Sequence, residues 1–270
     1  GTGGLLLGMK VSTRVSKMRS LPEGVDQRST IRPPDFLGAD DLSVKIEELR
    51  IATNYKVPIF IKMGATRPRY DVAIAAKAGA DVVVVDGAEG GTGASPELLL
   101  NHTGIPTISS IRAARESLDE CNMSDKVSLV AAGGIRSGVD AAKALALGAD
   151  AVMIGNSAMI AMGCNTPRYL EDYKALGTSP GACHHCHTGR CPVGVATQDP
   201  ELEKRMNPHA GAERIARFMT AMTMEITALA KACGKSSVHN LEIEDLRALS
   251  FEASAFTGIK MAGIDKAFGW

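Results

Sequence analysis

One order of residues occurs twice in this chain and constrains its fold more than any other feature. At 75–82 and again at 142–152, an Ala-rich segment leads into Gly-Ala-Asp and then into apolar residues. The Ala-rich segment is typical of a helix, the Gly ends it, and the apolar residues are typical of a strand. Two such units favour βα repeats of a single barrel over two separate domains.

Four short apolar runs predict buried strands, at 57–63, 81–87, 129–135 and 150–156. Helices are expected before and between them, at 12–19, 40–53, 70–79, 110–119 and 138–148, with 104–110 as a loop. Continuous apolar strands that alternate with helices indicate a parallel sheet covered on both faces. The predicted fold class is therefore α/β.

The chain changes character after the fourth strand. Residues 157–210 are rich in Cys, His, Pro and Gly, and we expect no strand there. A long amphipathic helix is predicted over 211–233, with Ile215, Phe218, Met222 and Ile226 on one face. A short helix at 241–249 and a final loop should follow. Residues 1–40 predict ordered loop around the helix at 12–19.

Charge and cysteine usage exclude several classes of protein. The 270 residues contain 30 Lys+Arg and 30 Asp+Glu, and this balance argues against a nucleic-acid partner. No apolar run approaches the roughly 20 residues of a membrane helix, and no signal-peptide pattern occurs. Three of the six cysteines fall within nine residues, which favours a metal site in the reducing cytoplasm over a disulfide framework.

Two features lie where strands would end at the mouth of a barrel. Lys62 closes the strand at 57–63, where its ammonium could stabilise negative charge on a cofactor or substrate. The Gly-rich loop 87–96 follows Asp86 and could close over a carboxylate or carbonyl. The plainer interpretation of Lys62 is a surface lysine, and that of the loop 87–96 is a flexible linker.

Glycines after the last two strands suggest a phosphate site. The sequence A-A-G-G-I-R-S-G occupies 131–138, and Ile154-Gly155-Asn156-Ser157 ends the fourth strand. Glycine lets backbone N–H groups approach a phosphate, and a following helix adds a positive dipole. In barrels, the loops after the last two strands frequently hold a phosphate. The alternative is that these glycines only permit tight turns.

The cysteine motif is the most specific chemical signal. Cys183, Cys186 and Cys191 have the spacing C-x₂-C-x₄-C and are followed by Pro192. Closely spaced thiolates on one loop favour an iron–sulfur cluster. Zinc is the rival, because His184, His185 and His187 lie among the cysteines. Cys164 is the other nearby thiol.

Together these motifs resemble the FMN-binding domain of glutamate synthase. The resemblance starts with G-T-G-G-L-L-L-G-M-K-V-S at residue 1 and continues through P-E-G-V-D (22–26) and the Ile-Lys strand end. It then includes G-G-T-G-A-S-P (90–96), A-G-G-I-R-S-G (132–138), G-N-S-A-M-I-A-M-G-C (155–164) and C-H-T-G-R-C-P-V-G-V-A-T-Q-D-P-E-L (186–202). The G-G-T-G-A-S-P and C-P-V-G-V-A-T-Q stretches are specific to the family.

The resemblance implies the C-terminal half, strands 5–8, of a TIM (β/α)₈ barrel over 1–160. An iron–sulfur loop would occupy 161–210, and a helical segment packed on the barrel would occupy 211–270. FMN would bind at the mouth. The cofactor-binding residues implied are Lys62, Asp86, Gly133, Gly134, Arg136, Gly155 and Asn156. The catalytic positions implied are Lys62, Gly91, Thr92 and Gly93.

The reaction implied is reductive amination of 2-oxoglutarate. Ammonia condenses with the keto acid, reduced FMN gives a hydride to the imine, and the cluster delivers electrons. In bacterial relatives a Gly-Cys shortly before the C-H-x-x-x-C segment supplies the first cluster ligand. Here the matching Cys164 is followed by an insertion, 165–182, and by the additional Cys183. The ligands expected are Cys183, Cys186, Cys191 and Cys164, around a [3Fe–4S] or [4Fe–4S] cluster.

The partners implied are glutaminase-like, β-helix-like and electron-donor subunits. The first four strands of the barrel are expected from another segment or chain. Two alternatives stay open. One is the large subunit of N-methylglutamate synthase, which forms N-methylglutamate from methylamine and glutamate. The other is an iron–sulfur electron-transfer or scaffold subunit without catalysis.

Overall fold

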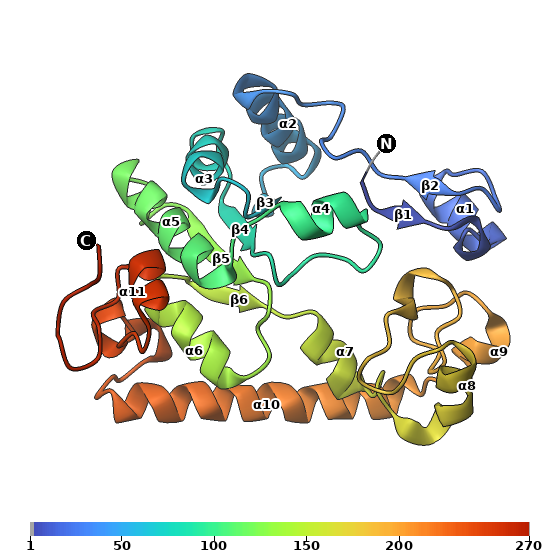
Figure 1. The fold of residues 1–270 in the computed structure, drawn as a ribbon. Helices are drawn as coiled ribbons and strands as arrows, with labels where there is room; N and C mark the ends of the chain where they lie inside the picture. The colour runs from blue at the N-terminus through green and yellow to red at the C-terminus, as the bar shows by residue number, and fades with distance from the viewer. Residues whose placement is uncertain (1–2, 270) are drawn as a thin grey trace. The chain divides into compact units, whose positions relative to one another are not determined.

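The computed structural model describes residues 3–269, so the first two residues of the N-terminal Gly-rich motif and Trp270 lie outside it (Figure 1). The chain forms two compact units, each built from separate stretches of sequence. The first contains 3–31, 92–102 and 156–219, and the second contains 32–91, 103–155 and 220–269. The boundaries fall inside the Gly-rich loop 87–96, at the end of the fourth predicted strand, and inside a long helix.

The second unit is built on a four-stranded parallel sheet in the order β3-β4-β5-β6. The strands are β3 (Phe60–Gly64), β4 (Val82–Asp86), β5 (Ser128–Ala132) and β6 (Ala151–Met153). On one face of the inner strands, Val83, Val85, Leu129 and Ala131 are fully buried. Their neighbours in sequence point to the other face, where Val84, Val130 and Ala132 form a small apolar cluster.

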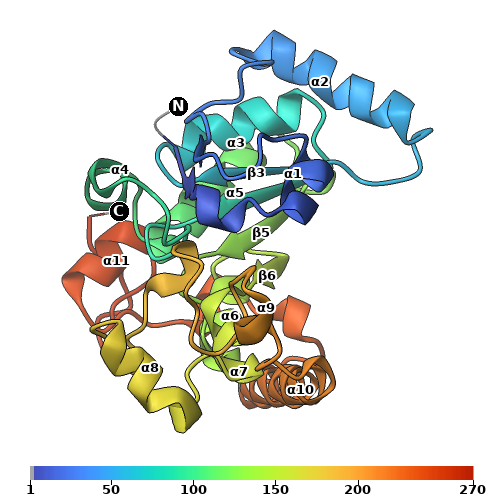
Figure 2. The same cartoon turned by 90° about the vertical axis from the view of Figure 1, so that its right-hand side faces the viewer.

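Helices α3 (Pro68–Lys77) and α5 (Thr107–Glu120) pack against each other and against the strands. Figure 2 shows both helices behind the sheet, so they cover one face together. Helix α6 (Gly138–Ala146) packs against β6 and, through Ala142 and Leu145, against Ala230 of α10 (Pro208–Ala232). The unit also contains α2 (Ala39–Ala52) and α11 (Phe251–Thr257).

The repeated Gly-Ala-Asp segments form two equivalent connections at the amino ends of the strands. Asp81 accepts a hydrogen bond from the Ile59 N–H at 2.7 Å, and Arg50 of α2 donates to Asp81 at 2.9 Å and to the Gly79 carbonyl at 2.7 Å. In the second repeat, Asp150 accepts from the Leu129 N–H at 2.7 Å. Arg115 of α5 donates to Asp150 at 2.9 Å and to the Gly148 carbonyl at 2.7 Å. Each aspartate therefore binds the preceding strand and an arginine from a helix.

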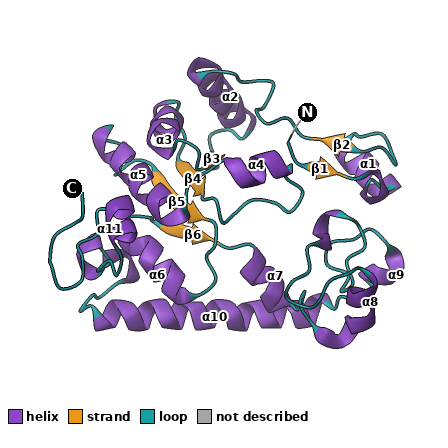
Figure 3. Cartoon of the chain, in the orientation of Figure 1, coloured by secondary structure: helices purple, strands orange, loops and turns teal. Residues whose placement is uncertain are grey.

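The first unit contains mostly short helices and turns. Figure 3 shows its only described strands, the antiparallel pair β1 (Leu5–Leu6) and β2 (Gln27–Arg28). The helices are α1 (Thr13–Arg19), α4 (Glu97–His102), α7 (Asn156–Met162), α8 (Leu170–Ala175), α9 (Pro200–Glu203) and the beginning of α10. Ser12 caps α1 by accepting from the Val15 N–H, which explains why this helix begins where the sequence predicts.

The α/β class, the four parallel strands and the helices before and between them are confirmed. The prediction of buried strands is right for β4 and β5 and wrong for β3 and β6. These two are the edges of the sheet, and Phe60 and Met153 are 53% and 39% exposed. An apolar run has the same composition in an edge strand as in an inner one.

Three further predictions are wrong at the chain ends. The predicted helix at 241–249 is instead two 3₁₀ turns, Val238–Asn240 and Ile243–Asp245. The predicted final loop contains α11, which Ser250 begins by accepting from the Ala253 N–H and Gly258 ends with a positive φ. The region 1–40 contains β1 and β2, which are two residues each and too short for any pattern of alternation.

We expect Arg115→Ala to lower the free energy of unfolding by about 1–2 kcal/mol, because a guanidinium that is 14% exposed loses its bonds to Gly148 and Asp150. Urea denaturation of the full chain measures this. Arg217→Ala is the matched control, since Arg217 is 80% exposed and its partner Glu213 is exposed too, so its loss should stay below about 0.5 kcal/mol. Equal losses in the two variants would contradict the structural role of Arg115.

The Asp81 connection should also be visible in acid. The hydrogen bond from Arg50 is the largest cause that lowers the pKa of Asp81 below its ordinary value of 3.8. A lowered pKa in the folded state contributes stability above the unfolded value, and this contribution disappears as the pH falls through the folded value. The stability difference between wild type and Arg50→Ala should therefore be constant above about pH 4 and shrink below it. A difference that stays constant in acid would contradict this.

Candidate functional site

Lys62 forms an ion pair with Asp86, which ends β4. Lys62 lies in the middle of β3, so the prediction that it ends this strand is wrong. The Lys62 ammonium lies 3.1 Å from the Asp86 carboxylate and 3.7 Å from the Met153 sulfur at the end of β6. The carboxylate is 14% exposed, whereas the lysine is 50% exposed. The ion pair therefore holds the ammonium of Lys62, while half of the lysine side chain remains exposed to solvent.

Thr107, the first residue of α5, connects the loops that follow β4 and β5. It is 4% exposed, and its hydroxyl lies 2.7 Å from the Glu89 carboxylate and 3.0 Å from the Gly133 carbonyl. Its N–H also donates to Glu89 at 2.9 Å. A Cβ at Gly133 would stand 2.7 Å from the Thr107 hydroxyl and 3.0 Å from the Gly87 nitrogen, and the φ of Gly133 is +101°. Only glycine fits this close approach.

The amino end of α6 already has a carboxylate partner. Glu225 of α10 accepts from the Gly138 N–H at 2.7 Å, and Asp140 accepts from the Arg136 N–H at 3.0 Å. The helix dipole that the sequence argument assigned to a phosphate is therefore directed at Glu225. Gly133 and Gly134, which follow β5, have φ values of +101° and +70°.

The other predicted cofactor-binding and catalytic residues are distributed over both units. In the second unit, Arg136 is 81% exposed and pairs with Asp140, and Gly155 has open space where a side chain would be. Gly91 also belongs to this unit and has a φ of +93°. Thr92, Gly93 and Asn156 belong to the first unit, where Asn156 begins α7. Lys62, Asp86 and the glycines after β5 thus share one unit, whereas the predicted G-T-G segment is divided.

The four predicted metal ligands gather in the first unit. Cys191 is 7% exposed and forms an apolar cluster with Tyr173 and Val193, against which Cys164 and Cys183 pack. Tyr173 is fully buried and donates to the Cys164 carbonyl at 2.7 Å. Because Tyr173 belongs to the insertion 165–182, the insertion contributes to the wall of the cysteine group.

The pKa values of these groups reflect their proximity. Burial, followed by the neighbouring thiols Cys186, Cys191 and Cys183, raises the pKa of Cys164 to about 11. The same two causes raise the pKa of Tyr173 to about 12. Burial and two neighbouring thiols also raise the pKa of Cys186, while the positive charge of Lys10 lowers it. A positively charged group bound among the four thiols would reverse this penalty and favour their thiolate forms.

Two imidazole nitrogens beside the thiols lack partners. The Nδ1 atoms of His185 and His187 are buried and make no hydrogen bond, although the His185 Nε2 lies 3.0 Å from the Leu176 carbonyl. Such buried polar atoms normally have a partner. Within residues 3–269, no three His, Cys, Asp or Glu side chains converge on the position of a single ion. Four thiols and two unpaired imidazole nitrogens are the donor chemistry that suits an iron–sulfur group.

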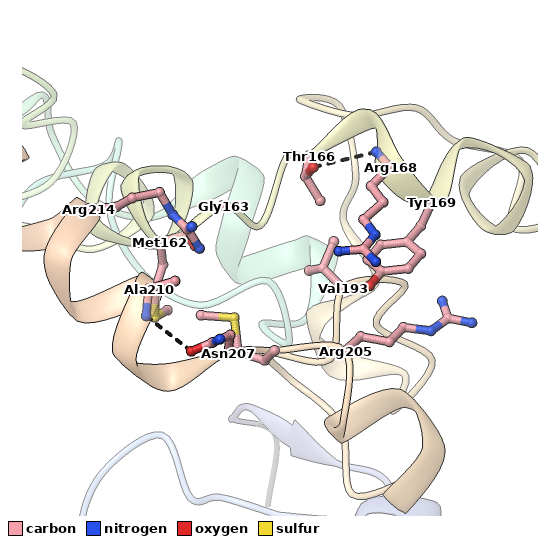
Figure 4. Close-up of a pocket in the computed structure, with 11 residues that line it drawn as sticks. Met162, Gly163, Thr166, Arg168, Tyr169, Val193, Arg205, Asn207, Ala210 and Arg214 are labelled. Atoms are coloured by element: carbon pink, nitrogen blue, oxygen red, sulfur yellow. Dashed lines mark hydrogen bonds between the residues drawn. The ribbon is translucent and has the colours of Figure 1, made fainter.

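A pocket of about 420 Å³ borders the cysteine group in the same unit (Figure 4). Its lining includes Gly163, which precedes Cys164, and Val193, which packs on Cys191. Arg205 pairs with Asp172 at 3.0 Å, donates to the Pro192 carbonyl at 2.7 Å and stacks on Tyr169 at 4.6 Å. Arg205 therefore connects this pocket to the backbone next to Cys191.

Comparison with known proteins identifies the family. Residues 1–236 match the model described as the conserved region in glutamate synthase. The chain belongs to the glutamate synthase family. A glutamate synthase large subunit-like protein of Rhizobium meliloti is 52% identical over 97% of this chain, and an archaeal glutamate synthase [NADPH] of Methanocaldococcus jannaschii is 39% identical over 97%. The chain spans 60% and 49% of these two relatives.

More distant comparisons add little to this assignment. A ferredoxin-dependent glutamate synthase of Cyanidium caldarium is 32% identical over 96% of this chain and 16% of its own length. Among solved structures, a flavocytochrome b2 mutant aligns with a TM-score of 0.46 and 21% identity over 85% of this chain and 42% of its own. In the described part of this family member, no helix is both long and apolar enough to cross a membrane.

The sequence of this glutamate synthase family member does not predict the contacts of three residues at these sites. Glu89 lies within the predicted Gly-rich loop, but nothing in the sequence pairs it with Thr107. Thr107 itself falls in the segment expected to be loop. Tyr173 was counted only as part of an insertion. The insertion also contains Tyr169, Leu170 and Leu176, so its sequence does not single out Tyr173.

We expect Gly133→Ala to destabilise the protein by about 1–3 kcal/mol, because the added methyl group would meet Thr107 and strain the backbone. Gly155→Ala is the matched control at the neighbouring strand end, since no atom lies within 4 Å of its added Cβ. Thermal unfolding of both variants measures the difference. Similar unfolding temperatures for Gly133→Ala and wild type would contradict the close packing around Thr107.

Proposed function

We propose that this chain is the flavin- and iron–sulfur-containing part of a glutamate-synthase-type oxidoreductase that carries out reductive amination of 2-oxoglutarate. When bound, FMN supplies the hydride and the cluster supplies electrons one at a time. The observation that carries the proposal is the gathering of Cys164, Cys183, Cys186 and Cys191 around the buried Cys191, in a chain of this family. Thiols that hold such a cluster need a reducing compartment, so we propose a cytoplasmic location.

The four parallel strands are proposed to be strands 5–8 of a (β/α)₈ barrel. Helices cover one face of the sheet, and the other face carries Lys62, Val84 and Val130. Lys62 and Met153 stand on the two edge strands, yet their side chains meet across this face. Edge strands of a flat four-stranded sheet lie about 14 Å apart, so this contact supports a sheet that curls toward that face. The remaining strands would come from another segment or chain.

Lys62 is proposed to bind the flavin side of the site. Its ammonium would stabilise negative charge on the reduced ring, and Asp86 would hold the ammonium in place. Gly133 and Gly134 would donate backbone N–H groups to the phosphate, and Gly155, Asn156 and Arg136 complete the proposed cofactor set. Gly91, Thr92 and Gly93 are proposed to contact the keto acid. The segments 1–160, 161–210 and 211–270 would then serve as half-barrel, cluster loop and helical support.

The cluster is proposed to have four thiolate ligands. Cys183, Cys186 and Cys191 come from one loop, and Cys164 follows α7 on the other side of the insertion. Four thiolates suit a [4Fe–4S] cluster, whereas three suit [3Fe–4S]. Cys164 is therefore the ligand that decides the cluster type. Tyr173 would fix the backbone of Cys164 and exclude water from the group.

The visible spectrum of the assembled enzyme tests the proposal. We expect flavin bands together with iron–sulfur absorbance, and loss of iron in Cys183→Ser, Cys186→Ser and Cys191→Ser. Cys164→Ser should keep iron but change the electron paramagnetic resonance signal from a four-iron to a three-iron cluster. Cys121→Ser in the other unit is the control and should retain the wild-type cluster. Zinc without iron would overturn the cluster, and iron without flavin would favour an electron-transfer or scaffold subunit.

The amine is tested separately in the assembled complex. We expect ammonia to support reduction of 2-oxoglutarate, with kcat reduced in Lys62→Met because the positive charge beside the reduced flavin is lost. Methylamine with glutamate is the comparison. Activity with methylamine and glutamate, but not with ammonia and 2-oxoglutarate, would assign the chain to the N-methylglutamate synthase type.

A further inference from the structure

Lys10 lies against the cysteine loop, although more than 170 residues separate them in sequence. Its ammonium donates to the Cys186 carbonyl at 2.8 Å. The stem of the same side chain runs over Gly189, where an added Cβ would stand 3.3 Å from the Lys10 Cγ. The lysine therefore spans the loop between Cys186 and Cys191, and its charge is held at one end of that span.

The neighbouring contacts fix this position. The Ser12 hydroxyl donates to the Gln198 side chain at 3.2 Å, and the Gly8 N–H donates to Asp26 at 2.6 Å. Lys10 is the last residue of the 3₁₀ turn Gly8–Lys10 and is half-buried. No carboxylate forms an ion pair with Lys10 among the described residues, so its charge is not neutralised by a neighbour. The hydrogen bond from the ammonium to Cys186 is exposed to solvent, so salt screens the effect of this charge.

We propose that Lys10 is a positioning residue that raises the reduction potential of the iron–sulfur cluster through its positive charge. The inference rests on the proposed function, because it requires a cluster at Cys164, Cys183, Cys186 and Cys191. A cluster with thiolate ligands is anionic, and one-electron reduction adds one further negative charge. A fixed cation next to Cys186 stabilises the reduced form more than the oxidised form. The cluster potential depends on local charge as well as on its ligands.

The test is a potentiometric titration of the cluster in the assembled enzyme, followed by electron paramagnetic resonance. Lys10→Met removes the charge and the hydrogen bond at similar length, whereas Lys10→Gln removes the charge and keeps a donor. In both variants we expect the ratio of reduced to oxidised cluster at a fixed potential to fall by roughly tenfold, which is about 59 mV for one electron. Lys10→Arg keeps the charge and should titrate close to wild type.

Lys17→Met is the matched control. Lys17 follows Lys10 in the same N-terminal segment and lies in the last turn of α1. Its substitution should leave the potential of the cluster unchanged. Iron and sulfide are determined in every variant before titration.

A wild-type potential in Lys10→Gln with an intact cluster would overturn the inference, because the hydrogen bond and not the charge would then be responsible. Loss of iron from both neutral variants would also overturn it, since Lys10 would then hold the loop instead of setting the potential. Absence of iron and sulfide from the wild type would refute the proposed function itself.

Discussion

The carboxylates of Asp81 and Asp150 determine where the parallel strands begin. Each binds the amide of a residue just before or near the start of the neighbouring strand, and each is paired with an arginine from a helix. Strands that begin at a common level also end at a common level, because the parallel register pairs them residue by residue. The positions of Asp86 and Gly133 at the carboxyl ends of the strands, and of Lys62 within β3, depend on this arrangement. The structural aspartates thus lie at the amino ends of the strands, and the candidate site residues lie toward the carboxyl ends.

The first unit is organised by a different constraint, the cost of bringing four thiols together. Burial and mutual repulsion raise the pKa of Cys164 and Cys186, so the apo protein favours neutral thiols. Bound iron would repay this cost by binding the thiolates. The insertion contributes to this balance, because Tyr173 closes the apolar side of the group while Arg205 supports the backbone at Pro192.

The sequence predicts the elements whose signals are local. The Gly-Ala-Asp repeat predicts α3, β4, α6 and β6, because a helix end and a strand start are encoded by adjacent residues. It cannot predict which strands lie at the edges, because that depends on the order of strands in the sheet. The interactions of Glu89 with Thr107 and of Glu225 with Gly138 join residues 18 and 87 positions apart, so no local pattern encodes them. The cysteine spacing predicts a cluster loop, whereas the contribution of Tyr173 depends on how the insertion folds.

The N-terminal Gly-rich segment illustrates why a family motif can be recognised before its physical role is understood. Composition alone indicates a loop, yet this segment is tightly packed. A Cβ at Gly8 would stand 2.2 Å from the Gly24 carbonyl, so glycine at this position permits two backbone segments to touch. That close approach places the 3₁₀ turn that ends in Lys10. Lys10 in turn reaches Cys186, and Gly189 leaves space for its stem. The glycines at the start of the chain therefore matter for the cysteine loop because they determine where a distant positive charge is placed.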